Sequence, residues 1–349
     1  MILESSEDRR QSLAFCQEIL PDVSRTFAIS IRFLPGVLGR AVLVAYLLCR
    51  IADTVEDDPV APASKKVALL DQFMDCFEKT ASANAFPKDA VAVQGEEAHI
   101  RLLRNTDLVF VVFRSLPEAT RQVVHHWVDE MVQGMKKFVG LYPEGIRIQT
   151  IAEYNEYCYY VAGTVGHLLT DLWHQHSRSI SKQKYDLLLV RCEAFGEALQ
   201  TVNILKDIAW DAEHENSIYI PEQSLQGFGS SQQTLLHPGY LEKNHAAVAS
   251  MIDIAWSDLD EAQEYLLQIP KIAAPIRLFC ILPLLFAYAT LREIAHSNAM
   301  LQSGGTVKIT RAEVKSLILA GATAVVSNQR VRQLVNHVRH EPFVLKWAA

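Results

Sequence analysis

The chain has 349 residues, of which 50% are hydrophobic and 21% charged, so it can bury a sizeable core. Its net charge is −7 and its basic residues are dispersed, which excludes a broad nucleic-acid-binding surface. An anionic ligand must therefore be met by local charges or a metal ion. The six cysteines include no CxxC pair and the N-terminus is too polar for a signal peptide, which indicates a reduced, cytoplasmic protein.

Apolar residues recur at three- and four-residue spacing with few alternating runs, which predicts an all-α protein. The predicted helices cover residues 9–20, 36–55, 64–83, 98–113, 117–138, 150–175, 181–210, 243–268, 271–298 and 311–337. Breaks rich in Pro, Gly or polar residues fall at 58–62, 86–89, 141–145, 220–239 and 303–305. None resembles an interdomain linker, so we expect one domain over residues 1–349. No apolar run reaches the roughly 18 residues of a membrane span.

Asp53 and Asp57 follow the apolar run that ends at Cys49-Arg50. Their spacing of four stacks both carboxylates on one helix face, where they repel each other unless a cation lies between them. Mg²⁺ prefers carboxylate oxygens and keeps waters that a diphosphate can replace. The alternative interpretation is a solvated acidic helix end before a proline-rich loop.

A second polar pattern consists of Asn203, Asp207 and Asp211, which recur every four residues along an otherwise apolar helix, with Gln200 at the edge of the same face. A buried stripe of this kind needs ions, a charged ligand or a hydrogen-bond network with another helix. Helix bundles build metal sites from carboxylates on facing helices, so the two patterns together predict a metal–diphosphate site.

Four basic side chains are candidates to pair with diphosphate oxygens. They are Arg25, Arg32, Arg50 and Lys206. Each one also fits an ordinary surface charge.

Four blocks resemble the squalene/phytoene synthase family in the family's order, within a resemblance that covers about residues 10–330. They are SRTF at 24–27, YLLCRIADTVEDDP at 46–59, YCYYVAGTVG at 157–166 and LQTVNILKDIAWD at 199–211. The resemblance implies a single-domain helical bundle of the isoprenoid-synthase type with a central substrate cavity. One departure is Lys206, which stands where arginine is usual and loses its bidentate geometry.

The resemblance also implies roles for individual residues. Mg²⁺, or Mn²⁺ in its place, and the substrate diphosphates are expected at Asp53, Asp57, Asn203, Asp207 and Asp211. Further substrate contacts are expected at Ser24, Arg25, Thr26, Phe27, Arg50, Gln200, Lys206 and Phe279. Tyr157 matches the family tyrosine assigned to acid–base or cation-stabilising work, with Tyr160 as a weaker candidate. The glycines of the GTVG segment instead suit close helix packing.

Three features favour the squalene branch over the phytoene branch. They are the DTVEDD string, the stretch Phe279–Pro283 followed by Ala289-Thr290-Leu291, and the loop Val307–Arg311. In that branch two farnesyl diphosphates condense head to head to presqualene diphosphate, which NADPH then reduces to squalene. Lys308 matches a residue implicated in NADPH binding, and Arg311 lies one position beyond the usual arginine.

Other activities fit the sequence less well or differ in the last step. The alternative within the family is a phytoene or dehydrosqualene synthase, which loses a proton and needs no NADPH. A terpene cyclase does not fit the spacing of the second stripe. A helical assembly factor without catalysis would retain the fold but has no need of all the acidic side chains.

The resemblance to the eukaryotic enzymes does not extend to a C-terminal membrane anchor. We therefore expect a cytoplasmic protein, with peripheral contact to the inner membrane left open. The terminal residues 343–347 either contact lipid or pack against the protein. No sequence feature indicates an oligomeric state.

Overall fold

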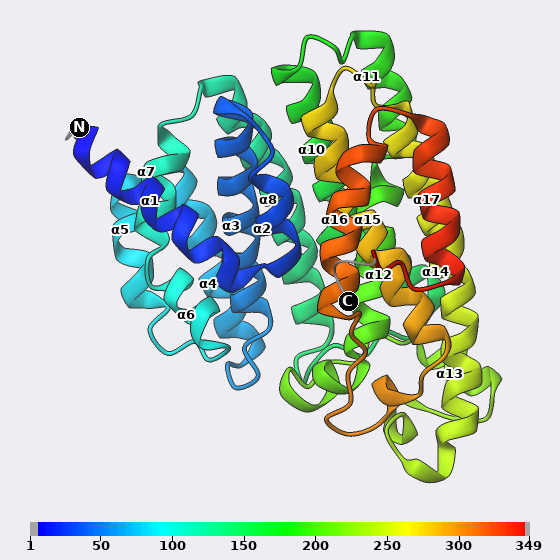
Figure 1. Ribbon diagram of the computed structural model, residues 1–349. Coiled ribbons are helices and arrows are strands. Elements are labelled where there is room, and N and C mark those ends of the chain that lie inside the picture. The colour runs from blue at the N-terminus through cyan, green and yellow to red at the C-terminus, as the bar shows by residue number, and fades with distance from the viewer. Residues whose placement is uncertain (1–5, 346–349) are drawn as a thin grey trace. The chain divides into compact units, whose positions relative to one another are not determined.

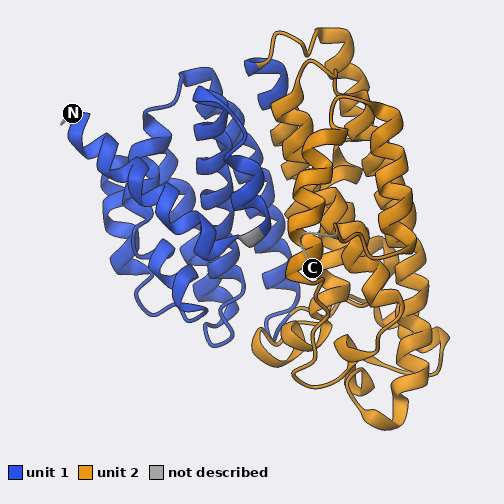
Figure 2. Ribbon diagram, viewed as in Figure 1, with its two compact units in different colours: residues 1–145, 171–176 blue, residues 146–170, 177–349 orange. Residues whose placement is uncertain are grey.

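The computed structural model describes residues 6–345, except for the side chain of Arg25. Within this range the chain forms helices and one isolated bridge between Arg147 and Ile218, so the all-α prediction is confirmed. Two compact units are present, and Figure 2 colours them separately. Unit 1 contains residues 1–145 and 171–176, and unit 2 contains residues 146–170 and 177–349. Whether they act as the expected single domain stays a prediction.

Unit 1 is built around the apolar helix α3 (Figure 1), which packs against α1, α7 and α8. Its helices are α1 (Ser6–Val23), α2 (Arg25–Ile31), α3 (Gly36–Glu56), α4 (Ala63–Glu78), α5 (Thr80–Asp89), α6 (Glu97–Leu103), α7 (Thr106–Arg114) and α8 (Glu118–Leu141). A cluster of phenylalanines joins α4, α5 and α7, with Phe73 and Phe110 5.9 Å apart between ring centroids. This core fixes α3 and hence the position of its acidic end.

Unit 2 is centred on α12 (Cys192–His214), which packs against α14, α15 and the π-helix η1. The remaining elements are α9 (Ile151–Cys158), η1 (Tyr159–Gly163), the first part of α10 (Thr164–His176), α11 (Lys182–Leu189), α13 (Glu222–Gly227), η2 (Gln232–Thr234), η3 (Pro238–Tyr240), α14 (Leu241–Gln268), α15 (Ala274–Ala295), η4 (Ala299–Leu301), α16 (Arg311–Ala324) and α17 (Asn328–His340). A Cβ on Gly166 would lie 1.8 Å from the Cys192 carbonyl oxygen, and one on Gly196 would lie 2.0 Å from that of Ala162. Glycine is therefore required at both crossings, which confirms the packing role expected at Gly166.

Several helix boundaries differ from the predictions. The predicted break at 86–89 is wrong, because Pro87 lies inside α5 and the chain breaks at Lys79 instead. Phe73 and Phe86 pack 5.8 Å apart, and this contact requires the chain to reverse between them. The helix α2 was not predicted, since its seven residues are too few for a periodic pattern.

The helix α15 is long and apolar enough to span a membrane. The apolar run Leu278–Leu291 within it is too short to indicate this from the sequence. The helix has 22 residues with a mean hydropathy of 1.8 in its most apolar window, and 78% of that window is buried in the fold. No other described helix is long and apolar enough to do so. Its buried side chains make α15 a core helix of unit 2.

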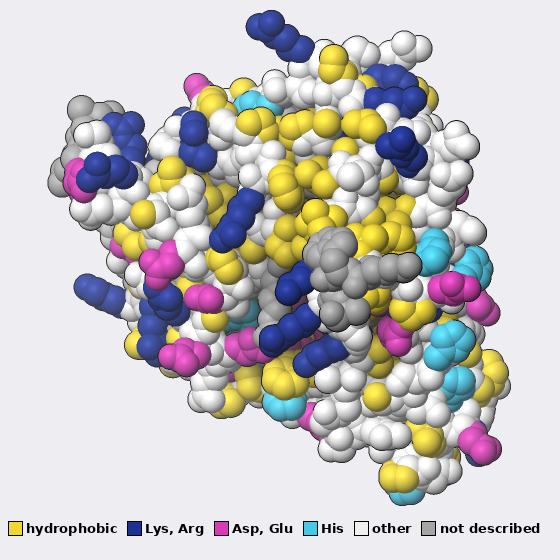
Figure 3. Space-filling view, in the orientation of Figure 1, with side chains coloured by type: hydrophobic (Ala, Val, Ile, Leu, Met, Phe, Trp, Pro, Cys, Tyr) yellow, Lys and Arg dark blue, Asp and Glu magenta, His cyan; other side chains and the backbone are white. Residues whose placement is uncertain are grey.

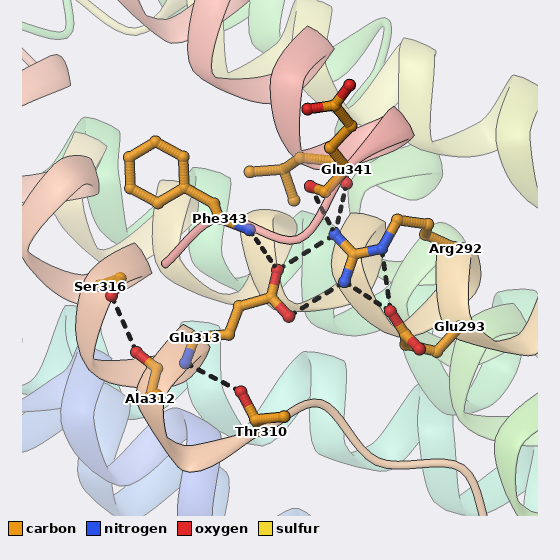
Figure 4. Close-up of polar contacts among 9 residues, drawn as sticks. Arg292, Glu293, Thr310, Ala312, Glu313, Ser316, Glu341 and Phe343 are labelled. Carbon is orange, nitrogen blue, oxygen red and sulfur yellow. Dashed lines mark hydrogen bonds and ion pairs between the residues drawn. The ribbon is translucent and has the colours of Figure 1, made fainter. Parts of the chain in front are cut away.

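The segment after α17 is hydrogen-bonded to a buried ion pair of α15 and α16 (Figure 4). Nη2 of Arg292 lies 2.9 Å from Oε2 of Glu313, and both side chains are 3% exposed. The backbone N–H of Phe343 donates to Oε1 of Glu313 at 2.9 Å. Phe343 is half-buried with its ring 5.2 Å from that of His337, whereas Val344 is 42% exposed and residues 346–347 lie outside the described range. The choice between lipid contact and packing for the terminal patch stays a prediction.

Candidate active site

The first acidic pair lies at the C-terminal end of α3. Asp53 occupies its last turn and Asp57 is the C-cap, with the Asp57 N–H donating to the Asp53 carbonyl at 2.8 Å. Nη1 of Arg50 lies 3.4 Å from Oδ2 of Asp53, which makes Arg50 its basic neighbour. The predicted grouping of Asp53, Asp57 and Arg50 is therefore present within unit 1.

Negative charge is in excess at this end of α3. Burial raises the pKa of Asp53, and the nearby Arg50 opposes the shift. Burial, and then the charges of Asp57 and Asp53, raise the pKa of Glu56 well above its usual value, although Lys66 opposes them. Oε1 of Glu56 is also buried without a hydrogen-bond partner among the described residues. A cation beside these carboxylates would favour their ionised form.

Mg²⁺ fits this donor set. No group of three or more His, Cys, Asp or Glu side chains within residues 6–345 is placed to hold a metal ion by itself. Mg²⁺ is commonly held by one or two carboxylates together with water and substrate phosphates, and an aspartate pair supplies that share of the ligands.

Asp58, the next carboxylate in the sequence, has a different role. It is 2% exposed, and Oδ1 accepts hydrogen bonds from the N–H groups of Val60 at 2.9 Å and Ala61 at 3.1 Å. Oδ2 accepts a third from the N–H of Gln94 at 3.3 Å. Asp58 therefore holds the loop that follows α3 and is not free to bind a ligand.

The start of α2 is connected to the acidic end of α3 through Tyr46, the first residue of the block 46–59, to which the sequence analysis gave no role. Ser24 caps α2 and accepts a hydrogen bond from the Phe27 N–H at 3.1 Å. The ring of Phe27 lies 5.6 Å from that of Tyr46, whose hydroxyl donates to the Val23 carbonyl at 3.1 Å. The Arg50 guanidinium carbon lies 6.0 Å from the centre of the Tyr46 ring.

The other predicted residues of α2 are less informative. Thr26 is half-buried, and the predicted contact of Arg25 concerns a side chain outside the described part of the chain. Arg32 is the C-cap of α2 and lines a hollow at the N-terminal end of α3, away from its acidic end. Arg32 is therefore a poor candidate for the diphosphate.

The polar stripe of α12 is only partly buried. Asn203 is exposed, and the side chains of Lys206 and Asp207 are 30% and 33% exposed, with Nζ and Oδ2 3.0 Å apart. Asp211 is half-buried, as is Gln200 near the middle of the helix. The opposite, apolar face of α12 packs into unit 2, so the side chains of Asn203, Lys206 and Asp207 remain accessible to a ligand.

Tyr157 lies on α9 and is 3% exposed. Its ring stacks on Tyr219, with centroids 4.9 Å apart and an interplanar angle of 28°. Tyr219 in turn lines a small hollow together with Ile204, Ile208 and Asp211 of α12. The structure thus connects Tyr157 with the end of the polar stripe through Tyr219, a loop residue that no motif or periodicity identified.

The predicted cofactor loop is bonded to the same helix. The Gly304 N–H donates to Oε2 of Glu213, two residues beyond Asp211, at 3.0 Å. Lys308 is exposed in the loop, and Arg311 is exposed as the first residue of α16. Phe279 is 1% exposed in the core helix α15. Unit 2 therefore contains the stripe, the tyrosine and the loop, whereas its pairing with the aspartates of α3 stays a prediction.

Glu197 and Asp258 are two half-buried carboxyl groups of unit 2 that should make stability depend on pH. Burial first, and then the charges of Glu193 and Asp258, raise the pKa of Glu197 from 4.5 to about 7. Burial also raises the pKa of Asp258 to about 6. Between pH 4.5 and about pH 7, Glu197 is protonated in the folded protein and ionised in the unfolded chain. The stability of the folded protein therefore falls as pH rises through this range.

Glu197→Gln should therefore stabilise the protein at pH 8 by about 1–2 kcal/mol, after allowance for partial exposure, and should have little effect at pH 4.5. Urea unfolding at both pH values measures the difference. Glu242→Gln, at an exposed position of α14, is the matched control and should change stability by less than about 0.5 kcal/mol. Equal effects of Glu197→Gln at both pH values would contradict the assignment.

The described residues form a helical fold with paired carboxylates at the end of one apolar helix and a polar stripe along another, which fits the isoprenoid-synthase type of protein. The chain belongs to the squalene/phytoene synthase family, whose model matches residues 20–313. It is 30% identical to squalene synthase of Schizosaccharomyces pombe over 324 residues, covering 90% of this chain and 66% of that protein. It is 28% identical to squalene synthase of Yarrowia lipolytica over 334 residues, covering 90% of this chain and 67% of that protein.

The chain thus spans about two thirds of the length of these relatives. The solved structure of TcSQS in complex with the ligand BPH1237 has the same fold. It gives a TM-score of 0.79 at 24% identity and covers 94% of this chain and 98% of its own. The predicted family and fold class are confirmed.

Proposed function

We propose that the protein is a squalene synthase that condenses two farnesyl diphosphates to presqualene diphosphate and reduces this intermediate to squalene with NADPH. The observation that carries the proposal is the accessible polar stripe of α12 in a chain whose curated relatives at 28–30% identity are squalene synthases. The stripe, Tyr157 and the loop that carries Lys308 all belong to unit 2. A diphosphate site, an acid–base group and a hydride donor are the three requirements of this reaction.

The proposed role of each site residue follows from the chemistry of its side chain. Arg50 and Lys206 bind diphosphate oxygens, and Asp53, Asp57, Asn203, Asp207 and Asp211 supply oxygen ligands for Mg²⁺. When bound, the metal ion neutralises the leaving diphosphate. Ile204 and Ile208 keep water away from the carbocation beside Asp211. Tyr157 holds or transfers a proton at its phenolic oxygen, or offers its ring to the cation.

Product analysis tests the proposal directly. Purified protein is incubated with farnesyl diphosphate and Mg²⁺, with and without NADPH. We expect squalene only with NADPH and presqualene diphosphate without it. Dehydrosqualene in both reactions, or product only from geranylgeranyl diphosphate, would instead assign the protein to the carotenoid branch.

Lys308→Ala should weaken NADPH use. Lys308 is exposed on the loop whose Gly304 is bonded to Glu213 of α12, and its ammonium group is suited to pair with a phosphate of the cofactor. Loss of one charge-assisted contact should raise the KM for NADPH by about tenfold or more and let presqualene diphosphate accumulate. Lys315→Ala, exposed on the following helix, is the matched control. An unchanged KM for Lys308→Ala would remove the loop from the cofactor site.

A further inference from the structure

A hollow in unit 1 lies at the opposite end of α3 from the aspartate pair. It has a volume of 530 Å³, is open to solvent on one side, and is lined by residues of α1, α2, the α2–α3 corner and α3. Arg40, which lines it, precedes Asp53 by 13 residues, or about 20 Å along the helix. A ligand in this hollow would therefore be separate from the candidate active site.

The corner that forms the hollow is built by its backbone. Gly36 has a φ of +58°, a conformation that other residues adopt rarely. A Cβ on Gly39 would lie 2.3 Å from the Leu34 carbonyl oxygen, so only glycine permits this close approach. The hollow is thus a defined feature of the fold between α2 and α3.

The lining combines positive charge with apolar walls. Arg32 and Arg40 supply the charge, and none of the described lining residues is acidic. Neither arginine has an ion-pair partner in the described part of the chain. Leucines of three elements supply the apolar walls, namely Leu13, Leu20, Leu34 and Leu43. This pairing suits a ligand that carries a phosphate and a hydrocarbon portion.

The rim of the hollow favours a ligand that comes from a membrane over one that comes from solution. Phe33 directly follows Arg32 and is 40% exposed, and Arg32 itself is exposed. Figure 3 shows basic side chains beside hydrophobic ones over α1 and α2. An exposed aromatic ring beside arginines is the arrangement that enters the interface of an anionic bilayer. An enclosed tunnel would better suit a single prenyl diphosphate from solution.

We propose that this hollow, defined by Arg32, Arg40 and the surrounding leucines, binds the phosphate headgroup of an anionic phospholipid and docks the protein on a membrane surface. Both arginines hold the phosphodiester, Phe33 enters the interface, and the leucines contact the upper part of an acyl chain. The proposal does not depend on the proposed enzymatic function.

Vesicle flotation of the full chain tests it without an activity readout. The protein should float with vesicles of phosphatidylcholine and phosphatidylglycerol and stay unbound with phosphatidylcholine alone. The double variant Arg32→Gln/Arg40→Gln should bind about thirtyfold more weakly, since each basic residue near an anionic surface contributes about fivefold. Lys65→Gln/Arg104→Gln removes the same charge from other exposed positions of unit 1 and should lose less affinity.

A second variant separates the hollow from a general surface charge. Leu13→Trp keeps both arginines but fills the space between the helices, so it should also lose flotation while its circular dichroism and thermal midpoint stay close to those of the parent. Flotation of Leu13→Trp like the parent, or equal losses in the two double variants, would overturn the proposal. If inorganic phosphate or farnesyl diphosphate at micromolar concentration displaced the protein from phosphatidylglycerol vesicles, the hollow would be assigned to a soluble phosphate instead.

Discussion

Asp53→Asn in α3 and Asp207→Asn in α12 should each lower the turnover of farnesyl diphosphate by about a thousandfold or more. A metal ion that stabilises a leaving group contributes several kcal/mol to the transition state, and each 1.4 kcal/mol is about a factor of ten. Asn keeps the shape of the side chain but loses the charge that holds the ion. The measurement is the rate of diphosphate release as a function of Mg²⁺ concentration.

The fold should survive both changes, because Asn keeps the shape of each side chain and the ion pair of each carboxylate is with a neighbour on its own helix. Burial raises the pKa of Asp53, so its charge is unfavourable in the folded protein, and the Asp207 side chain is 33% exposed. The helical circular dichroism signal should therefore match that of the parent. Asp75→Asn, in an exposed pair with Lys79, is the control and should retain full activity. Activity like that of the parent in Asp53→Asn would remove α3 from the metal site.

Tyr157→Phe is expected to lower kcat by about a hundredfold or more while the KM for farnesyl diphosphate changes little. The substitution removes only the hydroxyl and leaves the ring stacked on Tyr219 at 4.9 Å. Because the proposed diphosphate ligands lie on α3 and α12, the loss should appear in the chemical steps and not in substrate affinity. Steady-state kinetics together with product analysis separate the two.

Two comparisons sharpen this result. Tyr219→Phe keeps the stacked pair and should leave kcat within about threefold, which tests whether Tyr219 acts only as a neighbour. Tyr157→Leu removes the ring as well as the hydroxyl. If Tyr157→Phe were fully active and Tyr157→Leu were not, the π-face and not the phenolic proton would carry the function. If Tyr160→Phe alone lost activity, the role would pass to Tyr160.

The long helices that carry the site could be predicted from periodicity. The predicted helix 36–55 is observed as Gly36–Glu56, because its uninterrupted apolar pattern leaves little ambiguity. The predicted helix 181–210 is instead two helices, since the chain turns at Val190-Arg191 before α12. No glycine or proline marks that turn, so it depends on packing that a single sequence does not display.

In the candidate site, too, local sequence patterns could be predicted and contacts between distant segments could not. Residues four apart on one helix, such as Asp207 and Asp211, were found because helix geometry alone brings them together. Tyr46 and Tyr219 were missed because they join elements that are distant in sequence, Tyr46 to α2 and Tyr219 to α9. One of the three partners of Asp58 was also hidden, since Gln94 lies 36 residues further on.

The π-helix η1 sets the rotational register between Tyr157 and Gly166. Each residue of an α-helix turns by about 100°, and a π-turn accommodates one additional residue without ending the helix. Because of this additional residue, Tyr157 stacks on Tyr219 while Gly166 contacts the Cys192 carbonyl. A regular α-helix with one residue fewer would keep the glycine crossing and turn the tyrosine away from the loop. The segment YYVAG therefore constrains chain length as well as residue type, and relatives that align the tyrosine with this glycine must preserve the same number of residues between them.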